Sequence, residues 1–274
     1  MLTLRTVAEM RAWSAEQSGS IGLVPTMGAF HAGHLSLIDA ARAENDHVVV
    51  WLFVNPTQFN EDRDLAAYPR DEARDAQLAE AHGADVLLAP GADEVYPAGF
   101  ATTVTVAGLG DTLEGAHRPG HFTGVATVVT KMLNIVGADR AYFGAKDAQQ
   151  VALVRRLVAD LNIPTEIVTL PIVRDPDGLA LSSRNVHLSA DERARATALS
   201  AGLRAAAQSG ERDADALKAI VLTTLRDAAV EPEYVAVVAP DSFAPLASVN
   251  GRGATIAVAA RVGSTRLIDN VELT

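Results

Sequence analysis

The chain has 274 residues, of which 49% are hydrophobic and 21% charged, and its formal net charge is −11. At about 100 to 200 residues per domain, this length predicts one large domain or two unequal ones, and the composition is typical of a globular protein. The lack of cysteine excludes disulfides, thiolate zinc sites and cysteine nucleophiles, and the acidic balance argues against a general nucleic-acid surface.

Short, β-branched and nearly all-apolar runs alternate with amphipathic stretches from residue 21 to residue 172. Such runs are typical of strands buried on both faces of a parallel sheet. We expect strands over 21–26, 47–54, 85–89, 140–143 and 166–172, and helices over 34–43, 71–82, 125–136 and 148–161. This alternation predicts an α/β fold with a doubly wound, Rossmann-like parallel sheet.

The pattern changes after the RDPDG stretch at residues 174–178. Ser189 and Glu192 form a capping-box pattern that predicts the start of a helix over 190–207. A second helix is expected over 214–227, and strands over 234–238 and 254–260. We therefore expect a Rossmann-like domain over 1–175 and a smaller C-terminal α+β domain over 186–274.

The stretch VPTMGAFHAGHLSLI places His31 and His34 between the first core strand and the first crossover helix. Ligands of open α/β sheets bind at this carboxyl edge, where a helix amino terminus attracts anions. Imidazoles can donate hydrogen bonds to phosphoryl oxygens. An isolated histidine here would more often be structural, and a metal site would need a third ligand that the spacing does not supply. The whole pattern favours a nucleotide phosphate site.

Polar side chains follow two further strands of the predicted sheet. FVNPTQF carries Asn55 and Gln58, whose amides could orient a polar substrate, although turn chemistry alone would also explain Asn55. RAYFGAKDAQQ places Lys146, Asp147 and Gln150 at a strand-to-helix turn. A lysine there is either a compact charge for phosphate or a solvated surface residue.

Two hydroxyls and a guanidinium lie in the predicted boundary loop LALSSRN, at Ser182, Ser183 and Arg184. Serine-rich loops usually only connect elements. A loop hinged between domains and ending in arginine could instead close over a leaving pyrophosphate.

Several motifs together identify a family. H-A-G-H resembles the H-x-G-H signature of the nucleotidylyltransferase superfamily, and S-S-R-N is similar to the mobile K-M-S-K-S loop of class I aminoacyl-tRNA synthetases. PTMGAFHAGH, FVNPTQF, YPRD, LEGAHRPGHFTGV, FGAKDAQQ and DGLALSSRN occur in the order typical of the pantoate–β-alanine ligases, also called pantothenate synthetases. The resemblance extends to VGSTRLIDNV and so covers essentially the whole chain.

This resemblance implies a reaction and a set of site residues. ATP and pantoate would form a pantoyl adenylate, and β-alanine would convert it to pantothenate and AMP. His31, His34 and Lys146 would contact the ATP phosphates, and Ser182, Ser183 and Arg184 would close over them. Further ATP contacts would come from Pro25, Met27, Gly144, Asp147, Val173 and Leu181. The pantoate and β-alanine pocket would include Met27, Gln58, Gln150 and Arg118.

The resemblance also implies a magnesium ion, for which Asp75 matches an implicated position, and a homodimer with a C-terminal lid. Ala145 and Ala148 depart from the glutamate and tyrosine expected there, and Leu181 replaces a usual methionine. With no signal-peptide pattern at the start and no apolar stretch of about 18 residues, we expect a cytoplasmic protein without a membrane span.

Two rival functions remain open at this point. One is a nucleotidylyltransferase that leaves AMP on its product, and the other is a noncatalytic nucleotide sensor, since a fold alone does not fix function. The retained histidines, Lys146 and serine loop disfavour the sensor. Gln58 and Gln150 suit a small hydroxy acid, which disfavours the first rival.

Overall fold

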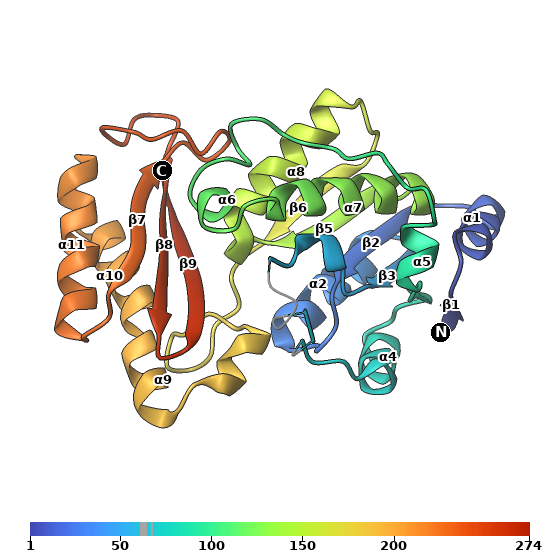
Figure 1. The fold of residues 1–274 in the computed structure, drawn as a ribbon, viewed down its shortest axis with the longest axis horizontal. Coiled ribbons are helices and arrows are strands. Elements are labelled where there is room, and N and C mark those ends of the chain that lie inside the picture. The colour runs from blue at the N-terminus through green and yellow to red at the C-terminus, as the bar shows by residue number, and fades with distance from the viewer. Residues whose placement is uncertain (61–64, 67) are drawn as a thin grey trace. The chain divides into compact units, whose positions relative to one another are not determined.

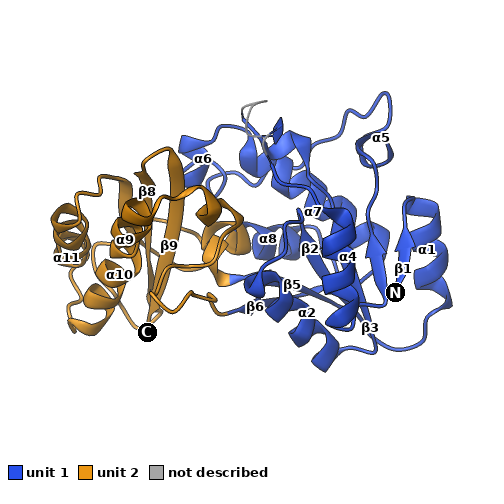
Figure 2. Ribbon diagram, turned by 90° about the horizontal axis from the view of Figure 1, so that it is seen from below, with its two compact units in different colours: residues 1–144, 153–170 blue, residues 145–152, 171–274 orange. Residues whose placement is uncertain are grey.

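The computed structural model describes residues 1–60, 65, 66 and 68–274, and the chain divides into two compact units (Figure 2). Unit 1 comprises residues 1–144 and 153–170, and unit 2 comprises residues 145–152 and 171–274. The sequence-based division placed 145–152 in the first domain. In the structure this segment belongs to unit 2, where the Ala145 and Lys146 carbonyls accept hydrogen bonds from Asn270.

Unit 1 contains, in its described part, a parallel sheet of six strands in the order β1-β4-β3-β2-β5-β6 (Figure 1). The strands are β1 (Leu2–Leu4), β2 (Ile21–Thr26), β3 (His47–Leu52), β4 (Val86–Leu88), β5 (Arg140–Gly144) and β6 (Glu166–Leu170). The chain runs outward from β2 through β3 and β4, then crosses back to β5 on the other side of β2. The predicted doubly wound α/β class is confirmed.

Helices connect these strands. They are α1 (Val7–Glu16), α2 (Ala32–Glu44), η1 (Pro56–Gln58), α4 (Glu72–Ala81), α5 (Ala92–Val95), α6 (Glu114–His117), α7 (His121–Val136) and α8 (Ala148–Asp160). Right-handed crossovers in opposite directions place α2 and α7 on opposite faces of the sheet. Apolar side chains of α2 and α4 form one core cluster with Val24, Val50 and Leu87 of the strands.

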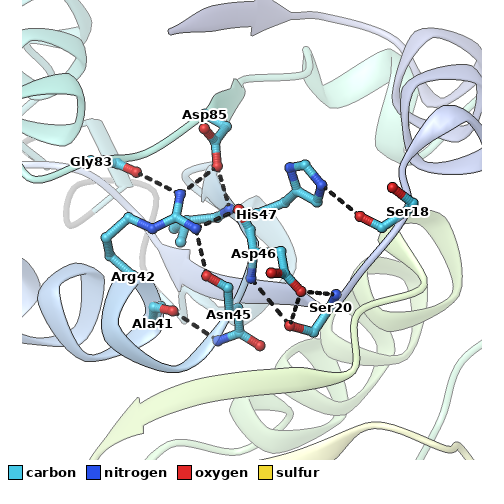
Figure 3. A network of polar contacts seen from close by, with 10 residues as sticks. Ser18, Ser20, Ala41, Arg42, Asn45, Asp46, His47, Gly83 and Asp85 are labelled. Atoms are coloured by element: carbon cyan, nitrogen blue, oxygen red, sulfur yellow. Dashed lines mark hydrogen bonds and ion pairs between the residues drawn. The ribbon is translucent and has the colours of Figure 1, made fainter.

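A polar network ties together the amino ends of three strands, β2, β3 and β4 (Figure 3). The Arg42 guanidinium binds the Asp85 carboxylate at 2.8 Å and also reaches backbone carbonyls at the end of α2. Asp46 accepts the Ser20 N–H at 2.8 Å. These groups lie at the edge of the sheet where the strands begin, so the network is structural and leaves the carboxyl edge for a ligand.

Unit 2 contains, among its described residues, an antiparallel sheet in the order β7-β8-β9 that packs on helices. Its elements are η2 (Ala145–Asp147), the start of α8, η3 (Ser183–His187), α9 (Ala190–Ala196), α10 (Ala198–Gln208), α11 (Ala214–Asp227), β7 (Pro232–Val238), β8 (Ala254–Val262) and β9 (Thr265–Leu273). The apolar faces of α10 and α11 bury Leu199, Leu203 and Leu217 against the central strand β8. The predicted small α+β region is confirmed.

The observed elements differ from the predicted ones in a few places. The helix expected over 190–207 is two helices that meet at Thr197, and β1, α1 and β9 were not predicted. The helix expected from residue 125 begins at His121, and the one expected from residue 34 begins at Ala32. Across the described residues, no helix is long and apolar enough to span a membrane.

Candidate active site

The turn after β2 ends in a helix cap made by two histidines. His31 is the N-cap residue of α2, and its Nδ1 accepts the Gly33 N–H at 3.1 Å. His34 Nδ1 accepts the His31 N–H in a longer contact of 3.4 Å, so the pair forms a reciprocal capping box. Because each Nδ1 is an acceptor, the neutral rings carry their protons on Nε2. In the neutral rings the Nδ1 atoms thus act as acceptors at the helix cap, and the N–H donor of each ring is at Nε2.

Gly33 allows the two rings to lie close to the start of α2. A Cβ atom at this position would lie 2.9 Å from His31 Cε1, a distance that a real Cβ almost never adopts. The His31 and His34 ring centroids are 4.2 Å apart with an interplanar angle of 36°. A larger residue at this position would therefore require the His31 ring to move.

A carboxylate from another helix holds the same turn. Asp75, in the first turn of α4, accepts the Ala29 and Phe30 N–H groups, both at 2.8 Å. Asp75 is buried, with 1% of its surface exposed. Ala29, one of its two partners, has a positive φ of 53°. Buried charges in proteins are hydrogen-bonded or paired, and here the partners are backbone groups of the turn. Asp75 therefore fixes the turn, and its role as a magnesium ligand stays a prediction.

The turn after β3 brings Gln58 against Met27. Both residues were predicted to line the pantoate pocket, and Gln58 Nε2 contacts Met27 Sδ at 3.0 Å. Gln58 Oε1 accepts from Asn55 Nδ2 at 3.0 Å. Asn55 Oδ1 accepts the Thr57 N–H and the Tyr96 hydroxyl. The Asn55 side chain therefore stabilises this turn, as expected if its role is in turn formation rather than in binding substrate.

Arg118 and His121 lie at the backbone of Gln58. His121 Nδ1 is 2.9 Å from the Gln58 carbonyl oxygen, and an Arg118 nitrogen is 3.1 Å from His121 Nε2. Since the carbonyl can only accept, Nδ1 carries the ring proton and Nε2 accepts from Arg118. Arg118 also donates to the Gln58 carbonyl at 3.3 Å. The structure therefore places Arg118 beside Gln58, one of the predicted pantoate residues.

Helix α7 approaches this turn through Gly124. A Cβ there would lie 2.4 Å from the Thr57 carbonyl oxygen and 2.9 Å from the Gln58 nitrogen. Asn55 Nδ2 also donates to the Gly124 carbonyl at 3.2 Å. The position of Gln58 therefore depends on backbone-to-backbone packing with α7.

Within unit 2, Lys146, Asp147 and Gln150 lie on η2 and the first turn of α8. The Lys146 ammonium is 3.7 Å from an Asp147 carboxylate oxygen, and its side chain is 22% exposed. This loose pairing leaves the charge accessible to an anion. Gly144, which ends β5 in unit 1, precedes this turn on the strand that pairs with β2.

The serine loop of unit 2 follows a short hairpin. The Leu181 N–H donates to the Val173 carbonyl at 3.0 Å, which brings two predicted ATP contacts together. Ser182 caps η3, with its hydroxyl accepting the Arg184 N–H at 3.3 Å. Ser183 and Arg184 lie in η3 itself.

The predicted site residues thus form local groups. The structure brings together His31 and His34, Met27 with Gln58 and Arg118, and Val173 with Leu181; Pro25 lies in β2. Sequence reasoning missed the supporting roles of His121 and Asn270, although both lie in motifs that carried the family resemblance. Among the residues described, no group of three or more His, Cys, Asp or Glu side chains could hold a metal ion.

The doubly wound sheet and its histidine-capped helix define an α/β protein with an H-x-G-H turn at the carboxyl edge of the sheet. The model of the pantoate–β-alanine ligase family matches residues 2–272. The chain is similar to pantothenate synthetase of Roseiflexus castenholzii, with 52% identity over 274 residues and 98% of each chain covered.

Solved structures agree with this match. A crystal structure of pantothenate synthetase from Thermus thermophilus has a TM-score of 0.92 and 47% identity, and 99% of each chain is covered. Pantoate–β-alanine ligase from Francisella tularensis, complexed with β-γ ATP and β-alanine, has a TM-score of 0.82 and 35% identity, with 99% of this chain and 97% of that chain covered. The chain belongs to the pantoate–β-alanine ligase family and is an ATP-using ligase of pantothenate biosynthesis.

Proposed function

We propose that the chain condenses pantoate and β-alanine to pantothenate through a pantoyl adenylate, and that it releases pyrophosphate and AMP. The observation that carries this proposal is the capping box that His31 and His34 form at the start of α2. Their Nδ1 atoms accept backbone N–H groups at the start of α2, so both Nε2–H groups can donate to phosphate oxygens. The positive end of the helix dipole adds to this attraction for anions.

In the first step, a carboxylate oxygen of pantoate attacks the α-phosphorus of ATP and pyrophosphate leaves. His31, His34 and Lys146 stabilise negative charge on the phosphates. Ser182, Ser183 and Arg184 close over the leaving group, while Gly144, Asp147 and Val173 hold adenosine with Pro25 and Leu181. No enzyme nucleophile is needed, because the substrate carboxylate attacks. The main task of the protein is to align the two reactants.

Pantoate is oriented by Met27, Gln58 and Gln150, and Arg118, which donates to the Gln58 backbone carbonyl, adds positive charge. The Gln58 amide nitrogen is engaged with a thioether sulfur, which is a weak acceptor. A substrate hydroxyl or carboxylate oxygen would be a stronger acceptor for the same N–H group. The side-chain oxygen of Gln58, Oε1, accepts a hydrogen bond from Asn55. This bond orients the Gln58 amide so that its N–H group can bind substrate in place of the sulfur.

In the second step, the β-alanine amine attacks the acyl carbon of the adenylate. The new C–N bond forms, the bond from the acyl carbon to the bridging oxygen breaks, and AMP leaves with that oxygen. Acyl adenylates hydrolyse readily, so the site must exclude water until the amine arrives. The relative from Francisella tularensis, complexed with β-γ ATP and β-alanine, supports the assignment of both substrates.

Magnesium enters this proposal with the nucleotide. Magnesium in such sites is usually held by substrate phosphates, with one or two carboxylates and several waters. We propose that Asp75 serves the turn rather than the metal, since each of its carboxylate oxygens accepts an N–H group there. The metal would neutralise phosphate charge. The alignment of pantoate with the α-phosphorus of ATP would be the task of the protein side chains.

Two further properties belong to the same proposal. A cytoplasmic location and a homodimeric state are inferred from the sequence and the family resemblance. Analytical ultracentrifugation of the purified protein tests the second, because a dimer would have about twice the chain mass of 28.7 kDa.

A labelling experiment tests the reaction. The protein is incubated with ATP, magnesium and pantoate carrying oxygen-18 in its carboxylate, with and without β-alanine. We expect pyrophosphate release without β-alanine, and label in AMP once β-alanine is added. Release of ADP, AMP retained on the product, or unlabelled AMP after full turnover would each rule out the pantoyl adenylate. Omission of pantoate is the control for plain ATP hydrolysis.

A further inference from the structure

A side chain on the strand β9 holds the backbone that carries Lys146. Asn270 is 6% exposed, and its Nδ2 donates to the carbonyl oxygens of Ala145 and Lys146, both at 2.9 Å. All three residues belong to unit 2 (Figure 2). One amide group thus uses both of its N–H donors on two successive carbonyls of η2.

These bonds matter because the Lys146 side chain has only a loose contact of its own. Its ammonium lies 3.7 Å from the Asp147 carboxylate, and a lysine side chain is a flexible stem with a point charge at its end. The place from which this stem starts is therefore set by the backbone of η2. Catalytic groups must be held within about 0.5 Å of the productive geometry by supporting contacts.

The neighbouring residue of β9 holds a second part of the site. Asp269 is 4% exposed and accepts two hydrogen bonds from Arg174, at 2.7 and 2.9 Å. Arg174 also donates to the Gly178 carbonyl at 3.2 Å. This fixes the hairpin that leads into the serine loop.

Successive residues of a strand point to opposite faces, so Asp269 and Asn270 act on opposite sides of β9. The two side chains connect one strand to η2 and to the base of the serine loop. We propose that Asn270 is a positioning residue for Lys146 and that Asp269 is a positioning residue for the loop of Ser182, Ser183 and Arg184. This inference rests on the proposed function of Lys146 and the serine loop as phosphate contacts.

The alternative is that Asn270 only satisfies buried carbonyls. In that case its loss would lower the stability of unit 2, and any effect on turnover would be the same with or without Lys146. Double-mutant cycles separate these possibilities, because residues that act through one another have non-additive effects.

The experiment compares Asn270→Ala, Lys146→Ala and the double variant. Glu272→Gln is the matched control, since Glu272 lies on the same strand and is exposed. We expect Asn270→Ala to lower kcat by about 10- to 100-fold, with the KM for β-alanine within about twofold of that of the wild type. In the Lys146→Ala background the same substitution should change kcat by no more than about twofold.

Equal fold-changes in both backgrounds, or a normal kcat for Asn270→Ala, would overturn the inference and leave the proposed function intact. Near-normal activity of Lys146→Ala would instead overturn the phosphate role of Lys146, and this inference with it. If Asn270→Ala does not fold, Asn270→Ser serves in its place, because a hydroxyl keeps one donor. In either variant, hydrogen exchange should rise in the peptide 145–152 and stay unchanged in β8. Unchanged exchange in 145–152 would also overturn the inference.

Discussion

The Asp75 carboxylate accepts the Phe30 backbone N–H at 2.8 Å, although Phe30 lies in the turn before α2 and Asp75 lies in α4, 45 positions further along the chain. With the Ala29 contact, this bond fixes the turn that ends at the histidine cap. The order of the proposed phosphate site thus depends on a buried carboxylate in α4.

We expect Asp75→Asn to lower the rate of adenylate formation by about 10- to 100-fold. The amide would place an NH₂ group against a backbone donor, and leaving such a group unsatisfied costs about 1–3 kcal/mol. The magnesium concentration for half-maximal activity should stay the same, as measured by pyrophosphate exchange at several magnesium concentrations. Asp71→Asn is the control, because Asp71 caps the same helix and asparagine caps equally well. Rescue of Asp75→Asn by excess magnesium would show a metal ligand instead.

His34→Ala should remove one preorganised donor to the phosphates and so slow pantoate-dependent pyrophosphate exchange by about 10²- to 10³-fold. The fold should be retained, since the loss of a cap costs about 0.5–2 kcal/mol. His82→Ala is the matched control, because His82 pairs with Asp39 at the surface, at the end of α4. Exchange at the wild-type rate in His34→Ala would contradict the phosphate role.

Lys146→Arg keeps the charge but replaces a compact ammonium by a larger planar group. We expect this variant to remain on the order of 10²-fold below the wild type in kcat. Lys218→Arg, at a surface pair with Asp215, is the control. A normal rate for Lys146→Arg would mean that Lys146 is a peripheral charge.

Gly124→Ala should act on pantoate more than on ATP. The added methyl would meet the Thr57 carbonyl and move the turn that holds Gln58, at a stability cost of about 1–3 kcal/mol. Steady-state kinetics should show the KM for pantoate raised by about 10-fold and the KM for ATP changed by no more than about twofold. Gly91→Ala provides the comparison, because a Cβ at Gly91 meets open space. Equal changes in both KM values would contradict a local effect on the pantoate pocket.

Tyr142 predicts a stability change at high pH. Burial, followed by a hydrogen bond to Glu44, raises the pKa of Tyr142 to about 12. The unfolded value is about 10, so the folded state binds this proton more tightly. The resulting stability is fully present below pH 10 and is lost as pH rises through about 12, by up to about 1.4 kcal/mol per pH unit. Urea unfolding of the wild type and Tyr142→Phe between pH 8 and 12 measures this; parallel curves would disprove it.

The sequence predicted the core strands because their apolar, β-branched runs are long and buried on both faces. It missed β1, which has three residues and, within the described part of the sheet, is an edge strand paired with β4. It also missed β9, an edge strand that mixes charged and apolar side chains. Neither strand has a hydrophobic run that stands out from a loop.

The site divides in a similar way. The place of His31 and His34 followed from a local strand, turn and helix pattern, which spans few residues. Asp75 and Asn270 act through backbone groups 45 and 124 residues away. No local pattern encodes such a contact, because it exists only once the fold has formed.

The bond between Asn270 and the Lys146 carbonyl also has a consequence for the growing chain. The ribosome adds Asn270 124 residues after Lys146, which at about 5–20 residues per second corresponds to roughly 6 to 25 s. During that interval the strands of unit 1 up to β5 are already available to pair, while η2 lacks its partner. Nascent chains arrested before Asn270 should therefore contain a folded parallel sheet, while the η2 turn that carries Lys146 still lacks its hydrogen-bond donor.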